Sequence, residues 1–101
     1  TVGVEDDDAP ALSLGPAYPN PFLGSARFDF SLAEAGSARM EVFDLSGRRV
    51  ATIVSGILTA GRHTARWDGR DEGGRAVGAG VYLLRLTAGG RILSARVIRA
   101  S

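Results

Sequence analysis

The feature that most constrains this chain is a series of short stretches in which apolar and polar residues alternate. In residues 27–32, Phe28, Phe30 and Leu32 occupy every second position and polar residues lie between them. A period of two places the apolar side chains on one face of an extended strand, whereas a helix requires a period near 3.6. Such stretches recur at a spacing of roughly ten residues, separated by glycine-rich turns, which is typical of all-β domains.

We therefore predict six strands, at 27–32, 39–44, 48–54, 62–67, 81–87 and 92–99, and a seventh is available at Leu12 and Leu14. Residues 55–61 and 68–80 are predicted loops, and Gly89 and Gly90 supply the positive φ angles that a tight hairpin requires. Residues 81–87 are the most apolar, so we expect that strand to be central and covered on both faces. The prediction is an antiparallel all-β sandwich, with an open barrel as the alternative.

The first seventeen residues differ in composition from the rest. Glu5–Asp8 is a run of four acids, and residues 9–17 are rich in Pro, Gly and Ala. Such a composition buries too little apolar surface to offset the entropy of ordering. We predict a flexible linker at 1–17 and one folded domain at 18–101. Outside the acidic run, the chain holds twelve arginines and seven acids.

Composition removes several kinds of chemistry. There is no cysteine and no lysine, because all twelve basic residues are arginine, and His63 is the only histidine. Disulfides, thiolate chemistry, lysine Schiff bases, P-loop phosphate sites and multi-histidine metal sites are thereby excluded. The net charge of +1 gives no indication of nucleic-acid binding. No apolar stretch approaches the roughly 20 residues of a membrane span, and the acidic start does not resemble a signal peptide.

Three candidate sites are weak. His63 lies in the middle of a predicted strand, and no Gly-x-Ser-x-Gly sequence accompanies it, so we expect a packing role. The glycines of 74–80 precede a strand rather than a helix, which argues against a nucleotide loop. The carboxylates of Asp68, Asp71 and Glu72 could bind calcium, but we expect them to hold turns by accepting backbone hydrogen bonds. We predict no catalytic residue and no cofactor, so we do not expect an enzyme.

The segment Tyr18-Pro19-Asn20-Pro21-Phe22 is the most informative. Its two prolines restrict Tyr18 and Asn20 to extended backbone geometry, which makes the segment stiff before folding. Tyr18 and Phe22 flank it as apolar anchors. We expect it to form a rigid entry into the sandwich.

This segment and several later motifs occur in an order that resembles the C-terminal sorting domain of proteins exported by the type IX secretion system. That domain is similar to the Ig-like domain of flagellar hook-capping proteins, and the resemblance covers roughly 18–100. The matching residues outside the segment above include Asp44, Gly47, Trp67, Asp68, Gly69, Asp71, Gly80 and Tyr82. The chain departs from the family in having no lysine in its last strand, where Arg96 and Arg99 stand instead.

The resemblance implies an Ig-like antiparallel β-sandwich of six to seven strands and a role in secretion and sorting. The partners would be a parent protein that precedes Thr1 and a translocon at the bacterial outer membrane. The destination would be the cell surface or the medium, by way of the periplasm. The end of the chain directly after the last strand agrees with this layout, and an export signal would belong to the longer parent.

We predict that the last hairpin, 81–99, presents the recognition surface, through Arg91, Arg96, Val97, Ile98 and Arg99. Deletion of 97–101 is then expected to leave the cargo in the periplasm. Two other functions stay open. Leu12 and Leu14 could pair with the sheet edge of another copy and build a filament or surface layer. A β-sandwich can also bind carbohydrate, although most of the seven aromatic residues occupy predicted core positions.

Overall fold

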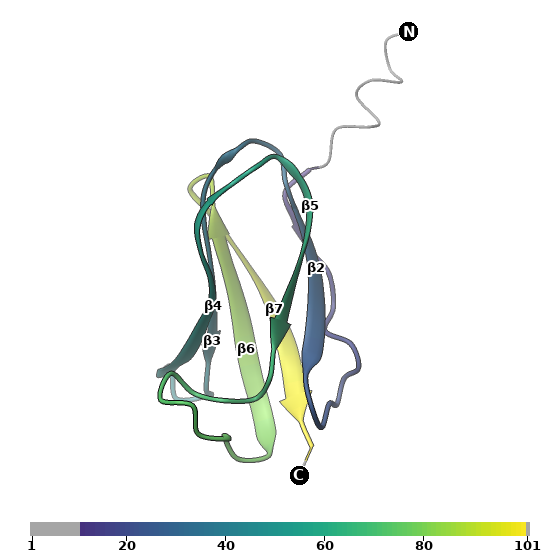
Figure 1. The fold of residues 1–101 in the computed structure, drawn as a ribbon, viewed down its shortest axis with the longest axis vertical. Coiled ribbons are helices and arrows are strands. Elements are labelled where there is room, and N and C mark those ends of the chain that lie inside the picture. Colours follow the sequence, from purple (N-terminus) through teal and green to yellow (C-terminus); the bar gives the residue numbers. More distant parts are fainter. Residues whose placement is uncertain (1–10, 101) are drawn as a thin grey trace, which may run out of the picture.

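The computed structural model describes residues 11–100 and shows two antiparallel sheets packed face to face (Figure 1). The three-stranded sheet has the order β1-β2-β5, with β1 at Ser13–Leu14, β2 at Ala26–Leu32 and β5 at Gly61–Trp67. The four-stranded sheet has the order β4-β3-β6-β7, with β3 at Gly36–Phe43, β4 at Arg49–Leu58, β6 at Gly80–Ala88 and β7 at Arg91–Arg99. The predicted all-β sandwich of six to seven strands is confirmed, and the described residues form seven.

The alternation seen in the sequence fixes which side chains form the core. Phe28, Phe30 and Leu32 of β2 point inward, opposite Leu84 and Leu86 of β6, and all five are at most 3% exposed. Burying a side chain of this size stabilises a fold by about 1.5–3 kcal/mol. The largest fully buried side chains are Trp67, Phe22, Phe28, Met40, Leu84, Leu86, Val42 and Val97.

Two strand predictions need correction. The predicted loop 55–61 is mostly strand, because β4 continues to Leu58 and pairs with β3 up to the Gly36–Leu58 pair. β6 is central, between β3 and β7, but only one of its faces is covered. Leu83 points outward and is 38% exposed, because nothing in the described chain packs on the outer face of the four-stranded sheet. The Gly89-Gly90 turn is as predicted, with φ angles of 58° and 75°.

The described part of the predicted linker belongs to the sandwich. Ser13 and Leu14 pair with Ser31 and Phe30 of β2, and Ala17 is buried. Within the described residues, the folded unit therefore begins before Tyr18, since even a two-residue strand can bury an apolar side chain on an existing sheet. Residues 1–10 of the predicted linker lie outside the described residues.

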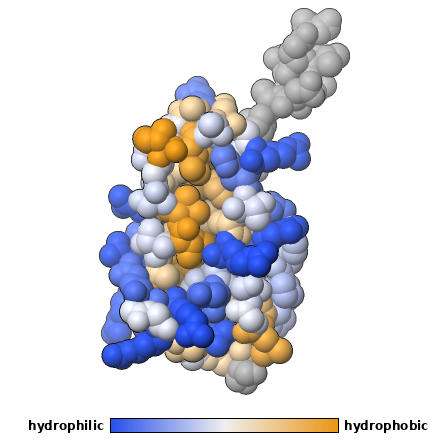
Figure 2. Space-filling model, in the orientation of Figure 1, coloured by the Kyte–Doolittle hydropathy of each residue, from blue (hydrophilic) through white to orange (hydrophobic). Residues whose placement is uncertain are grey.

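One side of the sandwich, where the edge strands β4 and β5 face each other, carries apolar groups. Figure 2 shows a column of apolar side chains down the middle of this view, with hydrophilic groups on both sides. Ile53 of β4 packs partly exposed against the core here, near Trp67. Among residues 11–100, no helix has the length and apolar character to cross a membrane.

Candidate functional site: a clasp around the last strand

The Tyr18–Phe22 segment closes on the end of β7. The amide of Phe22 donates to the carbonyl of Ile98 at 2.9 Å, and the amide of Ala100 donates to the carbonyl of Phe22 at 2.8 Å. Phe22 thereby forms a parallel bridge with Arg99. Both proline peptide bonds in the segment are cis. The expected rigid entry is thus also a short strand-like support for the chain's last strand.

Asn20 adds a second pair of contacts to β7. Its Oδ1 accepts a hydrogen bond from the amide of Ile98 at 2.8 Å, and its Nδ2 donates to the carbonyl of Arg96 at 3.3 Å. One side chain therefore replaces the partner strand that the outer edge of β7 lacks at this point. Asparagine suits the role because its amide offers a donor and an acceptor at once.

The ring of Phe22 is 1% exposed and joins a stack of aromatic residues between the sheets. Its centroid lies 5.5 Å from that of Trp67, and the Trp67 centroid lies 5.2 Å from that of Tyr82 in an edge-to-face arrangement. The Tyr82 hydroxyl donates to the carbonyl of Gly78 at 2.7 Å, and burial raises its pKa. Phe22, Trp67 and Tyr82, which come from distant motifs, thus form one aromatic cluster that packs below the end of β7.

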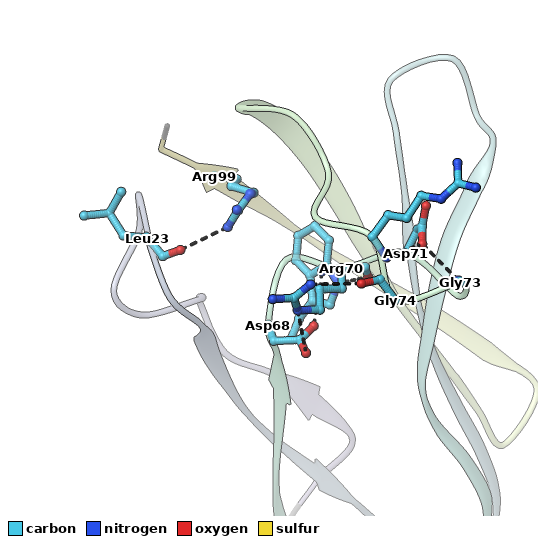
Figure 3. A network of polar contacts seen from close by, with 9 residues as sticks. Leu23, Asp68, Arg70, Asp71, Gly73, Gly74 and Arg99 are labelled. Carbon is cyan, nitrogen blue, oxygen red and sulfur yellow. Dashed lines mark hydrogen bonds and ion pairs between the residues drawn. The ribbon is translucent and has the colours of Figure 1, made fainter.

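The Arg99 side chain covers this aromatic cluster. Its Nε donates to the carbonyl of Val77 at 3.0 Å, and its Nη1 donates to the carbonyl of Leu23 at 3.0 Å (Figure 3). The guanidinium carbon also lies 5.8 Å from the centre of the Phe22 ring. Arginine can make these contacts together because its planar group carries several donors. We call Asn20, Phe22, Trp67, Gly69 and Arg99 the clasp.

Gly69 belongs to the clasp because the Arg99 side chain lies against it. A Cβ atom at Gly69 would come within 2.5 Å of Nη1 of Arg99, and its φ of +75° is one that glycine adopts without strain. The carbonyl of Gly69 accepts a hydrogen bond from the amide of Val77 at 2.8 Å. The glycine after Trp67-Asp68 therefore makes room for the arginine that holds β7.

The carboxylates of the following loop hold turns. Asp71 accepts from the amides of Gly73 and Arg75 at 2.9 and 3.0 Å, and Asp68 accepts from the amide of Arg70 at 3.1 Å (Figure 3). Glu72 points elsewhere and lies 3.3 Å from Arg49. Asp68, Asp71 and Glu72 line one shallow hollow, but within residues 11–100 no three acidic, histidine or cysteine side chains are placed so that they could hold one metal ion.

Asp44 organises the turn after β3 in the same way. Its Oδ1 accepts from the amides of Ser46 and Arg48 at 2.9 and 3.0 Å and from the Ser46 hydroxyl at 2.6 Å. These hydrogen bonds lower the pKa of Asp44, the Ser46 hydroxyl most of all. Gly47 completes the turn with a φ of +91°. Asp44 and Gly47 lie outside the clasp.

Tyr18 faces outward, onto the three-stranded sheet. Its hydroxyl donates to Asp29 at 2.6 Å and accepts a hydrogen bond from Nε of Arg27 at 2.8 Å. Asp29 also accepts from the hydroxyl of Thr64 at 3.0 Å. Hydrogen bonds from Tyr18 and Thr64 lower the pKa of Asp29. This network holds the start of the Tyr18–Phe22 segment on β2.

The structure divides the five predicted recognition residues. Val97 is fully buried in the core and Arg99 is committed to the clasp, whereas Arg91 and Arg96 are exposed and Ile98 is half-buried. The alternation along β7 contained the signal for Arg99, because it places residue 99 on the same inward face as Val97. Deletion of 97–101 would remove a core residue, so it tests folding rather than recognition.

The exposed part of the last hairpin is its outer surface. Along β6 and β7, apolar and basic side chains alternate there, and Leu83 pairs with Arg96 across the two strands. The guanidinium of Arg85 lies 4.4 Å from the centre of the Phe43 ring. We call this surface the outer hairpin face and define it by Val81, Leu83, Arg85, Ile92, Arg96 and Ile98.

His63 has a packing role. Its ring stacks on Phe30 with centroids 5.3 Å apart, and Nε2 lies 2.8 Å from the carbonyl oxygen of Thr59. The hydroxyl of Ser31, on the same strand as Phe30, bonds instead to Ser13 and Ala11. Within residues 11–100, the hydrogen-bond partner of the His63 ring is thus a backbone carbonyl and not a serine hydroxyl.

Comparison with known proteins identifies related domains. Residues 17–91 match the family model described as FlgD Ig-like domain. FlgD from Xanthomonas campestris, a protein of flagellar hook capping, is 26% identical with a TM-score of 0.61, over 84% of this chain and 64% of that protein. No curated protein matches the chain.

Two proteins of Porphyromonas gingivalis have the same fold. PorU has a TM-score of 0.67 at 22% identity, over 84% of this chain and 9% of PorU. PorZ, a surface component of the type IX secretion system, has a TM-score of 0.54 at 17% identity, over 90% of this chain and 12% of PorZ. The chain thus spans less than two-thirds of each of these three proteins.

Proposed function

The chain belongs to the FlgD Ig-like domain family, as its ordered motifs predicted, and on this basis we propose that it is a non-catalytic sorting module of the type IX secretion system. In this proposal, the module is part of a larger protein and directs it to the bacterial surface or the medium. The outer-membrane translocon recognises the module in its folded state. It is not an enzyme and requires no cofactor.

The observation that supports the proposal most is that the family motif residues make structural contacts around the end of β7. Asn20, Phe22, Trp67 and Gly69 come from two distant segments, and with Arg99 they hold the end of β7 in the sandwich. These residues therefore stabilise the position of β7 in the sandwich. A module whose motifs maintain one hairpin suits recognition as a rigid body better than it suits bond-breaking chemistry.

The outer hairpin face has the chemistry of a contact surface for another protein. Leu83 and Ile92 are 38% and 60% exposed, and the arginines beside them face solvent. Apolar side chains supply area to bury, and arginine is enriched in protein–protein interfaces. We propose this face, rather than the buried Val97 and the half-buried Arg99, as the surface that the translocon contacts.

A reporter fused in front of this module, in a bacterium that has a type IX secretion system, tests the proposal. The reporter is expected outside the cell with the native module and in the periplasm with the Leu83→Asp/Arg96→Glu variant. Arg66→Glu, on the other sheet, is the matched control and should leave export unchanged. Retention of the reporter with the native module would contradict the function. Normal export with the folded double variant would contradict the outer hairpin face as the contact surface, but it would leave the sorting function in place.

The second candidate is a part in an extracellular assembly, which the match to FlgD from Xanthomonas campestris favours. That protein acts in hook capping, which is essential for flagellar assembly. The N-terminal pairing segment of the self-assembly hypothesis is already engaged, because Leu14 pairs with Phe30 of its own sheet. Light scattering of the purified module distinguishes the two, since a sorting module is expected to stay monomeric at micromolar concentration.

A further inference from the structure

Within residues 11–100, the outer edge of β5 is regular and uncovered, and neither function proposed above uses it. β5 pairs with β2 along all seven of its residues without a register shift. The edge of β4 is less regular, because its pairing with β3 has two register shifts and its Val50 carbonyl accepts the amide of Glu72. The end of β7 is covered by Asn20 and Phe22. Bulges and covering segments of this kind prevent an edge from pairing with other chains, and β5 has neither.

The hydrogen bonds of β2 show which backbone groups of β5 face outward. The amide and the carbonyl of Arg27 both bond to Tyr18, on the opposite side of β2 from β5. Arg27 and the residue opposite it, Arg66, are therefore a non-hydrogen-bonded pair. Such pairs recur at every second residue of an antiparallel ladder. The amides and carbonyls of Arg62, Thr64 and Arg66 thus point outward from the edge of the sheet.

The side chains along this edge are basic. Strands β1, β2 and β5 contain three arginines and one acid, Asp29. Asp29 already accepts two hydrogen bonds and lies 3.7 Å from Arg27. Within residues 11–100, no carboxylate lies within 4 Å of the guanidinium of Arg62 or Arg66, and both side chains are exposed. The edge therefore presents two arginines, four residues apart, that have no acidic partner in the described chain.

The inner side of the edge opens on a hollow between β5 and β4. Its volume is about 520 Å³, and Ala51 and Ile53 of β4 and Trp67 of β5 line it. The carboxylates of the loop after β5 line its other end. Successive side chains of a strand point to opposite faces of a sheet, so a strand added to β5 would turn every second side chain toward this hollow. Apolar side chains at those positions would cover the half-buried Ile53.

We propose that the free edge of β5 binds an extended segment of another protein as a fourth strand of this sheet. The segment carries acidic side chains at positions i and i+4, opposite Arg62 and Arg66, and a small polar residue between them, opposite Thr64. Its residues at i+1 and i+3 are apolar and face the hollow. Main-chain hydrogen bonds provide affinity, and the two ion pairs fix the register.

Charge argues against a second copy of this chain as the occupant. Antiparallel pairing of two β5 edges centred on Thr64 would place Arg62 opposite Arg66 of the second copy, and like charges so placed are unfavourable. An acidic strand reverses the sign of both contacts. The edge also belongs to the opposite sheet from the outer hairpin face, so the proposal is independent of the sorting function, and loss of this binding should leave export unchanged.

Titration of the isotope-labelled full chain with a short peptide tests the proposal. The probe is Thr-Glu-Val-Thr-Val-Glu-Thr, capped at both ends. The amide signals of Arg62, Thr64 and Arg66 are expected to shift and to saturate at millimolar peptide, and their hydrogen exchange should slow at least threefold. Arg62→Gln/Arg66→Gln should weaken binding about fivefold. Arg91→Gln/Arg96→Gln, two exposed arginines on the other sheet, is the matched control and should leave binding unchanged.

Two altered peptides separate strand pairing from attraction between charges. Lysine in place of both glutamates should abolish binding. N-methylation of the glutamates and the central threonine should weaken it at least tenfold, because it removes the backbone donors that face β5. Three results would overturn the proposal: no shift at the β5 edge, equal binding of the N-methylated peptide, or the largest shifts at the edge of β4 or β7. The first would mean that Arg62 and Arg66 only keep this edge from pairing.

Discussion

Replacement of Phe22 by alanine should reveal how much the clasp contributes to stability. The Phe22 ring is 1% exposed, contacts Trp67 and lies below Arg99. Truncation of a buried phenylalanine costs about 3–5 kcal/mol, through lost burial and the cavity left behind. A domain of this size unfolds with a free energy of about 5–15 kcal/mol, so the variant loses a large share of its stability. At about 4–8 °C per kcal/mol, the Tm should fall by at least about 12 °C.

Leu23→Ala is the matched control for Phe22→Ala. Leu23 is the next residue and is 66% exposed, so its truncation should change the free energy of unfolding by about 0.5 kcal/mol or less. Chemical denaturation followed by the fluorescence of Trp67, the only tryptophan, gives both values. A cost below about 1 kcal/mol for Phe22→Ala, or equal costs for the two variants, would refute the clasp as a source of stability.

Two further predictions concern the clasp and its anchor on β2. Gly69→Ala should destabilise the domain by about 1–2 kcal/mol more than Gly74→Ala, because only the former displaces Arg99 from its hydrogen bonds, although both glycines have positive φ. Thermal melts should show this difference vanish in an Arg99→Ala background, and its persistence would contradict the explanation. Asp29 has a lowered pKa in the folded state, so the stability it contributes is present above about pH 4 and is lost as the pH falls through the folded pKa. Tyr18→Phe should raise the pKa of Asp29 toward its ordinary value in an NMR titration of the carboxyl group, and an unchanged titration would remove Tyr18 as the cause.

The strands could be predicted from the sequence because alternation reports directly on a half-buried sheet. The pattern of Phe28, Phe30 and Leu32 gave β2 its inward face, and Gly89-Gly90 marked the last hairpin turn. The length of β4 was harder to predict, because Ser55 and Gly56 resemble loop residues. Their pairing with β3 depends on tertiary contacts, which local composition does not report.

The clasp could be predicted only in part. The stiffness of the Pro19 and Pro21 segment was evident, but its docking on β7 joins residues nearly eighty positions apart, as in the contact between Asn20 and Ile98. No local pattern records such a pairing. The sequence predicts Arg99 as a recognition residue because the last strand lies at the end of the chain and carries three arginines, but the structure places its side chain in the clasp. Its alternation with Val97 was the clue to its inward position.

Amide hydrogen exchange tests most directly whether the clasp keeps the last strand in the sandwich. The amides of Phe22 and Ala100 are expected to exchange as slowly as those in the middle of β6, because they open only when the whole domain unfolds. In Asn20→Ala, exchange at Ile98 should accelerate at least tenfold while Leu84 in β6 changes far less. Rapid exchange at Phe22 and Ala100 in the native chain would contradict the clasp.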